Sequence, residues 1–157
     1  MKDKFLYGAL FGILADIPKE IVDFTIYLLG SKFYCWMIPA GITLSPKWNG
    51  TFWGLVVGGL NDFIIAGALG VGLTYFLTIM EKKHLFLKGM CYSFGIWLFF
   101  CMMVITRISY WVRMKDPGFY FQNFVAHQIW GLVATWLIIR YLFNKEQNKS
   151  MSLPGNH

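Results

Sequence analysis

The segment from Phe5 to Leu29 is apolar except at its centre, where three acids and one lysine surround a proline. These five residues are Asp16, Pro18, Lys19, Glu20 and Asp23. As one helix the segment would be roughly 38 Å long, enough to span a bilayer with some tilt. An ionised side chain at bilayer depth costs on the order of 2.5–3.5 kcal/mol. The charged side chains therefore need partners or water, and this requirement constrains how the chain can fold.

The composition is typical of an integral membrane protein. The chain has 157 residues, of which 57% are hydrophobic and 14% are charged, and its mean hydropathy is +0.51. A soluble domain carries about 25% charged residues. Aromatic residues make up 19% of the chain, which suits anchoring at membrane interfaces. We therefore predict an all-α domain in the cell membrane, in contact with its lipids.

The apolar stretches predict an integral membrane four-helix bundle within residues 1–143. Its spans cover about 5–29, 51–80, 85–106 and 121–143. The stretch 33–44 is also apolar, but it is too short to cross a bilayer and is expected to be interfacial or re-entrant. Residues 144–157 are mostly polar and are expected to form a disordered tail.

The charged residues of the first span fall on one side of the predicted helix. At about 100° per residue, one arc holds Gly8, Gly12, Asp16, Lys19, Glu20, Asp23 and Tyr27. The opposite arc, expected to face lipid, holds Leu6, Phe11, Ile13, Leu14, Ile17 and Ile21. Pro18 lacks a backbone donor and crowds the preceding turn, so a kink or a break is predicted there. In a broken helix, Asp16 would cap the second half.

Polar residues also occur inside the second and fourth spans. Asn61 and Asp62 lie in the second, and Asn123 and His127 share one face of the fourth. We predict that they meet the first span in one intramembrane polar cluster. Its members are Asp16, Lys19, Glu20, Asp23, Asn61, Asp62, Asn123 and His127. Within it, His127 would act either as a hydrogen-bonding strut or as a proton acceptor.

Small residues indicate the faces on which the helices pack. The positions are Gly8 and Gly12 in the first span, Gly54 and Gly58 in the second, and Gly131 in the fourth. Because glycine has no Cβ atom, two helix backbones can approach closely at these positions. The faces that carry them are therefore predicted to lie inside the bundle or against a partner.

The basic residues predict the orientation in the membrane. One side of the predicted bundle carries Lys2, Lys4, Lys82, Lys83, Lys88, Arg140, Lys145 and Lys149, and the other carries Lys32, Lys47, Arg107, Arg113 and Lys115. The more basic side of a membrane protein faces the cytoplasm. We therefore predict a multi-pass protein with both termini in the cytoplasm.

Motifs of several other protein classes are absent from the sequence. The net charge of +6 is not accompanied by a basic run with interleaved aromatics, so no nucleic-acid partner is expected. The motifs Gly-x-Ser-x-Gly, His-Glu-x-x-His and the P-loop do not occur, and no cofactor is predicted. Cys35, Cys91 and Cys101 show no metal-binding spacing and are expected to be free apolar thiols.

Three runs of the sequence resemble a known family. They are WNGTFWGLVVG from Trp48, EKKHLFLKGMCYSFGIWLFF from Glu81 and FVAHQIWGLVATWLIIRYLFNKE from Phe124. Their layout is similar to that of the uncharacterised YqhR-type four-span membrane proteins of Firmicutes. The resemblance covers roughly two-thirds of the chain and implies a four-span fold and a Gram-positive-like origin. It implies no activity, and the charge cluster of the first span is not part of it.

The sequence leaves three functional hypotheses open. The first is proton- or cation-linked transport or channel activity at the polar cluster, in a homo-oligomer. The second is a non-catalytic scaffold or accessory subunit that docks a larger membrane complex through its small-residue faces. The third is a membrane-embedded lipid-modifying enzyme, for which Asp16, Glu20, Asp62 and His127 would be the metal ligands. Two structural alternatives also stay open: the charges could cap a kink at Pro18, or the membrane boundary could lie near residue 16.

Overall fold

A computed structural model describes residues 3–31, 34–48, 50–101 and 117–143. The regular structure of these residues is helical, and they contain no strand. In chain order the elements are α1 (Lys4–Leu28), α2 (Met37–Thr43), the 3-10 turn η1 (Pro46–Trp48), α3 (Phe52–Ile79), α4 (Leu85–Phe99), α6 (Pro117–Ile138) and the π-helical turn η3 (Ile139–Phe143). The predicted all-α class is confirmed for this part of the chain.

The helices fall on the stretches that the sequence marks as apolar. The short α2 lies within the stretch 33–44, which was predicted to be interfacial or re-entrant. By length and composition alone, α3 is the one helix of the described residues that could cross a membrane. The predicted end of the third stretch (102–106) and the predicted tail (144–157) lie outside the described residues.

The first helix is capped at its start and passes through its proline. The side chain of Asp3 accepts hydrogen bonds from the first backbone amides of α1. Pro18 lies inside α1 without interrupting it. The predicted break at Pro18 is therefore absent, and Asp16 caps no second helix. The ion pair between Asp16 and Lys19 spans the proline and ties the flanking turns together.

The buried face of α1 is also its charged face. It consists of Gly8, Phe11, Gly12, Ala15, Asp16, Lys19, Glu20 and Asp23. The prediction that Phe11 faces lipid was wrong, because its exposed fraction is 4%. The reason is that α1 packs against both α3 and α6, so it buries a wider arc than one neighbour would cover. Tyr27, by contrast, lies at the edge of this face and is 38% exposed.

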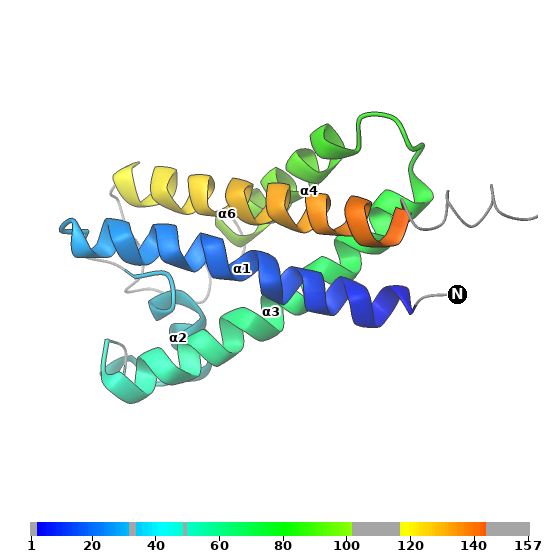
Figure 1. The fold of residues 1–157 in the computed structure, drawn as a ribbon. Coiled ribbons are helices and arrows are strands. Elements are labelled where there is room, and N and C mark those ends of the chain that lie inside the picture. The colour runs from blue at the N-terminus through cyan, green and yellow to red at the C-terminus, as the bar shows by residue number, and fades with distance from the viewer. Residues whose placement is uncertain (1–2, 32–33, 49, 102–116, 144–157) are drawn as a thin grey trace, which may run out of the picture.

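The long helices lie alongside one another and alternate in direction (Figure 1). The central helix is α1, which packs against α3 on one side and α6 on the other, while α4 packs mainly against α6 and α2 packs against α3. The start of α1, the α3–α4 turn and the end of α6 lie at one end of the bundle (Figure 1). At the opposite end lie the end of α1, the short α2 and the start of α6.

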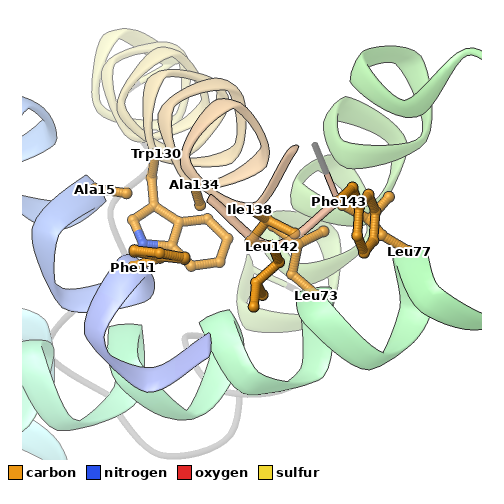
Figure 2. Packing of buried hydrophobic residues seen from close by; sticks show 9 residues of the cluster. All are labelled: Phe11, Ala15, Leu73, Leu77, Trp130, Ala134, Ile138, Leu142 and Phe143. Carbon is orange, nitrogen blue, oxygen red and sulfur yellow. The ribbon is translucent and has the colours of Figure 1, made fainter. Parts of the chain in front are cut away.

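The main apolar core fills the half of the bundle that holds the start of α1. Its members are Phe11, Ala15, Leu73, Leu77, Trp130, Ala134, Ile138, Leu142 and Phe143 (Figure 2). The indole of Trp130 also donates a hydrogen bond of 2.9 Å to the carbonyl oxygen of Gly12. This bond fixes α6 against α1 one turn from Asp16, so the apolar core positions the charged half of α1 directly.

Candidate functional site

The charged half of α1 is organised around the ammonium group of Lys19. Its Nζ atom lies 2.7 Å from Asp16 Oδ1, 2.9 Å from Glu20 Oε1 and 2.5 Å from Asp62 Oδ2. Asp16, Lys19 and Glu20 come from the buried face of α1, whereas Asp62 reaches in from the middle of α3. One cation therefore joins two helices through three acids at once.

The three carboxyl groups outnumber the ammonium group that they share. If all are ionised, the cluster carries two more negative charges than positive ones. The side chain of Lys19 is 6% exposed, and those of Asp16 and Asp62 are 1% and 17% exposed. Asp16 Oδ2 is buried and has no hydrogen-bond partner among the described residues. Buried carboxylates favour additional donors or positive charge, because an unpaired charge in a low-dielectric interior is costly.

Two side chains that the sequence analysis did not select bind the second acid of α1. The hydroxyl of Tyr34 donates to Glu20 Oε2 over 2.8 Å, and the thiol of Cys35 lies 3.2 Å from the same oxygen. Burial raises the pKa of both Tyr34 and Cys35 well above their usual values, so both remain protonated donors at neutral pH. The one sequence signal for these contacts is Gly30 at the end of α1. Its φ of 108° suits glycine and lets the chain turn back along α1, which brings Tyr34 and Cys35 to Glu20.

Asp23 belongs to a neighbouring polar group and has no ion pair within the described residues. It is 1% exposed, and its Oδ1 accepts a hydrogen bond of 3.2 Å from the amide of Gln122 in α6. The amide oxygen of Gln122 in turn accepts a hydrogen bond of 3.1 Å from the hydroxyl of Ser31. This chain of contacts extends from the charged face toward the end of the bundle where α1 ends.

A cavity of about 60 Å³ lies beside the Lys19 cluster. Its polar lining comes from three helices and consists of Asp16, Lys19, Asp62, Asn123 and His127. The Nδ1 atom of His127 lies 2.9 Å from the backbone oxygen of Asn123, which can only accept a hydrogen bond. Nδ1 therefore carries the proton, and Nε2 is the acceptor of the neutral ring. The cavity thus brings together groups from α1, α3 and α6 that can bind or donate protons.

Asn61 was predicted to belong to the intramembrane polar cluster, but the structure places it outside, against α2. Its amide donates to Thr43 Oγ1 over 2.9 Å and to the backbone oxygen of Pro39 over 3.2 Å. Adjacent residues of a helix point about 100° apart. When Asp62 faces α1, Asn61 therefore faces α2 and anchors that short helix to α3.

Asp16, Glu20, Asp62 and His127 were predicted as metal ligands, but the possible metal-binding atoms that lie close together in the described residues come from a different set. One carboxylate oxygen of Glu20, one of Asp62 and the sulfur of Cys35 lie within 4.8 Å of one another. Lys19 is paired with both of these acids. A metal ion at this point would have to displace the ammonium group, so the geometry suits an internal cation better than a resident metal.

The small residues lie at close contacts inside the chain. A Cβ atom on Gly8 or Gly12 would meet the backbone of α3, and one on Gly131 would meet Ser93 of α4. Gly54 packs against the backbone of Trp48, and Gly58 against that of Trp36. Ser93 also donates a hydrogen bond to the backbone oxygen of His127. These faces therefore bring α1 close to α3, and α4 close to α6, around the cavity.

Comparison with known proteins adds no relative. A scan against protein-family models gives no match, and searches of the curated proteins and of the solved structures give none either. The resemblance to the YqhR-type proteins therefore stays a prediction, and the functional argument depends on the geometry of the site.

Proposed function

We propose that the chain is a multi-pass membrane protein, a four-helix bundle whose buried charge cluster binds and moves a proton or a small cation. The observation that carries this proposal is the shared ammonium group of Lys19. Three carboxyl groups converge on it beside a cavity that His127 also lines. Ionisable groups at membrane depth that face a cavity are typical of ion and proton pathways.

The membrane part of the proposal is supported by the inverted polarity of α1. Its charged residues are buried, while Leu6 and Ile21 are each 62% exposed and Leu28 is 68% exposed. Large apolar side chains are exposed on α3, α4 and α6 as well. Water-soluble monomers rarely expose apolar patches of such extent. A lipid environment explains this surface, and α1 with 25 residues is long enough to cross it.

The proposed orientation puts the basic end of the bundle in the cytoplasm. Lys4, Lys82, Lys83, Lys88 and Arg140 lie at the end where α1 begins and α6 finishes. Lys47 of η1 belongs to the opposite end. Over the whole sequence eight basic residues are assigned to the first side and five to the other, and this excess supports cytoplasmic termini by the positive-inside rule.

In this proposal each polar residue has a distinct role. Asp16, Glu20 and Asp62 exchange the proton or cation, and Lys19 is the internal counter-ion. His127 is the relay, because its Nε2 atom is an acceptor and its ring lines the cavity. A homo-oligomer is part of the proposal, since one bundle encloses only a small cavity between its helices.

Ion flux into liposomes tests the proposal. Purified protein is reconstituted into vesicles that contain a dye sensitive to protons, Na⁺ or K⁺, and a gradient of the matching ion is applied in each case. We expect wild-type flux for one of these ions. Asp16→Asn and Asp62→Asn should each lower it by roughly tenfold or more, because each removes one acid from a buried network. Glu81→Gln, which removes an exposed acid in the α3–α4 turn, is the matched control.

Two results would contradict the transport proposal: no flux of any of the three ions in the wild type, or equal flux in all variants.

The scaffold hypothesis has less support, because the glycine faces it would offer to a partner lie against other parts of the same chain. The metal-dependent enzyme has less support because Lys19 is paired with Glu20 and Asp62, two of the predicted ligands.

A further inference from the structure

We propose that the ion moved at this site is the proton, and that water enclosed in the cavity carries it between the acids of α1 and α3 and His127 of α6. This inference rests on the proposed function, because it names which class of ion the same site moves. Three features carry it: the volume of the cavity, its polar lining from three helices, and the position of the Lys19 ammonium group.

The cavity has the size of a small group of water molecules. Its volume of about 60 Å³ admits a few of them, since roughly 10–15 Å³ admits one. Water is stable in a buried cavity that also offers it about two to four polar partners. The side chains of Asp16, Lys19, Asp62, Asn123 and His127 line the cavity and are such partners. Both the volume and the lining therefore suit water.

The same lining suits an inorganic cation poorly. Filters that pass such ions replace the hydration water with rings of oxygen atoms. Among the described side chains that line this cavity, those with an oxygen atom are Asp16, Asp62 and Asn123. One oxygen of Asp16 and one of Asp62 already bind the ammonium group of Lys19. That ammonium group also repels a second cation, because like charges at close range destabilise each other.

A proton needs no ring of oxygen atoms. A carboxyl group gives its O–H proton to a neighbouring water molecule, and that water passes one of its protons to the next acceptor. Each such step leaves a carboxylate behind and restores the water. Because water both donates and accepts hydrogen bonds, it joins groups on different walls of a cavity that do not contact one another. Chains of acids and histidines are typical proton relays of membrane proteins.

The groups at the two ends of this relay come from different helices. On one side are the three acids around Lys19, which carry a surplus of two negative charges when all are ionised. One of them can therefore take up a proton while the ammonium group keeps an ionised partner. On the other side is His127, whose neutral ring holds its proton at Nδ1 and can accept a second one. The cavity lies between these groups, since Asp62 and His127 both line it.

Flux measurements identify the ion. In the reconstituted vesicles, proton, Na⁺ and K⁺ fluxes are recorded separately with a dye for each ion. We expect the wild type to move protons and to move neither Na⁺ nor K⁺.

Two neighbouring isoleucines of α3 provide a matched pair of variants. Ile65 lines the cavity, whereas Ile64 is 69% exposed. Ile65→Phe adds a ring at the cavity wall and displaces water, so we expect loss of proton flux. Ile64→Phe makes the same change on the exposed face and should keep the wild-type flux. Neither variant alters an ionisable group, so a difference between them reports on the space that the water occupies.

Radiolytic footprinting detects the water directly. X-ray pulses convert bound water into hydroxyl radicals, which oxidise the side chains beside it, and mass spectrometry locates the oxidised residues. Trp130 is 3% exposed and lines the cavity, while Phe11 is 4% exposed and is not part of its lining. We expect Trp130 to be oxidised in the wild type and protected in Ile65→Phe. Phe11 should be protected in both proteins.

The outcomes separate this inference from the proposed function. Flux of Na⁺ or K⁺ would overturn the inference and leave the proposed function intact, whereas no flux of any ion would refute both. Wild-type proton flux in Ile65→Phe would overturn the water path alone. If Ile65→Phe fails to fold, as judged by size-exclusion elution, the wild-type footprint decides, because a protected Trp130 would show that the cavity holds no water.

Discussion

At the scale of single residues, Lys19 balances charges that would otherwise be buried without a partner. It contacts Asp16, Glu20 and Asp62, and its side chain is 6% exposed. We expect Lys19→Met to lower the free energy of unfolding by about 3–5 kcal/mol, the usual cost of removing one partner from a buried ion pair. Denaturant titration of the purified protein measures this change.

The control for this prediction is Lys83→Met, which removes an exposed lysine from the α3–α4 turn and should leave the unfolding midpoint unchanged. Adding Asp62→Asn to Lys19→Met should recover part of the lost stability, because fewer acids then lack a cation. Equal midpoints for Lys19→Met and the wild type would show that the three acids do not depend on this ammonium group.

The thiol of Cys35 should react unusually slowly with alkylating reagents. It lies in the connection between α1 and α2, where burial raises its pKa well above the ordinary value, so the reactive thiolate is scarce at neutral pH. We expect its alkylation by iodoacetamide at pH 8 to be at least roughly tenfold slower in the folded protein than in denaturant, since about one pH unit of pKa change alters the thiolate fraction tenfold. Mass spectrometry of the Cys35 peptide gives both rates, and equal rates would refute the burial.

The sequence predicts the charged face of α1 but not the residues that bind Glu20. The charged face of α1 follows from helical periodicity, so the burial of Asp16, Lys19, Glu20 and Asp23 could be anticipated. The partners Tyr34 and Cys35 could not, because their contact depends on how sharply the chain turns back after Gly30. Periodicity describes one helix at a time, whereas this contact depends on the path of a connection.

At the scale of helices, the crossing of α1 and α3 depends on glycine. A Cβ atom on Gly12 would collide with the backbone of Ala66 and Gly70. We expect Gly12→Ala to destabilise the protein by about 1–3 kcal/mol, the typical cost of overpacking. Gly95→Ala is a matched control, because a Cβ atom there meets nothing within 4 Å. That variant should gain about 0.5–1 kcal/mol from its better helix propensity.

Denaturant titration of both glycine variants measures the two effects under the same conditions. A neutral Gly12→Ala would show that the backbones of α1 and α3 are farther apart than described. A destabilising Gly95→Ala would instead indicate a contact on the outer face of α4, such as one with a second copy of the chain.

The predicted break of α1 at Pro18 is not found. Pro18 removes one backbone donor from α1, and that local cost was expected to kink or break the helix. In the structure α1 continues through it, since packing against α3 and α6 and the Asp16–Lys19 pair hold both flanking turns. Tertiary contacts outweigh a local penalty of about 3 kcal/mol, and such contacts are not visible in one segment of sequence.

At the scale of the whole molecule, the polarity of the bundle is arranged along its length. The apolar core fills the half where α1 begins, and the charged cluster, with the cavity, lies in the other half. In the proposed orientation, the charged half is nearer the outer side of the membrane and the apolar half is nearer the cytoplasm. The orientation therefore decides from which side a proton or cation would reach Lys19 and its acids.

Single-cysteine labelling tests this orientation. In a background with Cys35→Ser, Cys91→Ala and Cys101→Ala, one new cysteine replaces Lys83 in the α3–α4 turn or Lys47 in η1. Both positions are exposed, and they lie on either side of α3 in the chain, Lys47 before its start and Lys83 after its end. A membrane-impermeant maleimide applied to intact cells should label Lys47→Cys and spare Lys83→Cys, and inside-out vesicles should give the reverse. Labelling of both from the same side would refute the proposed topology, because an odd number of crossings separates the two positions in a four-span bundle.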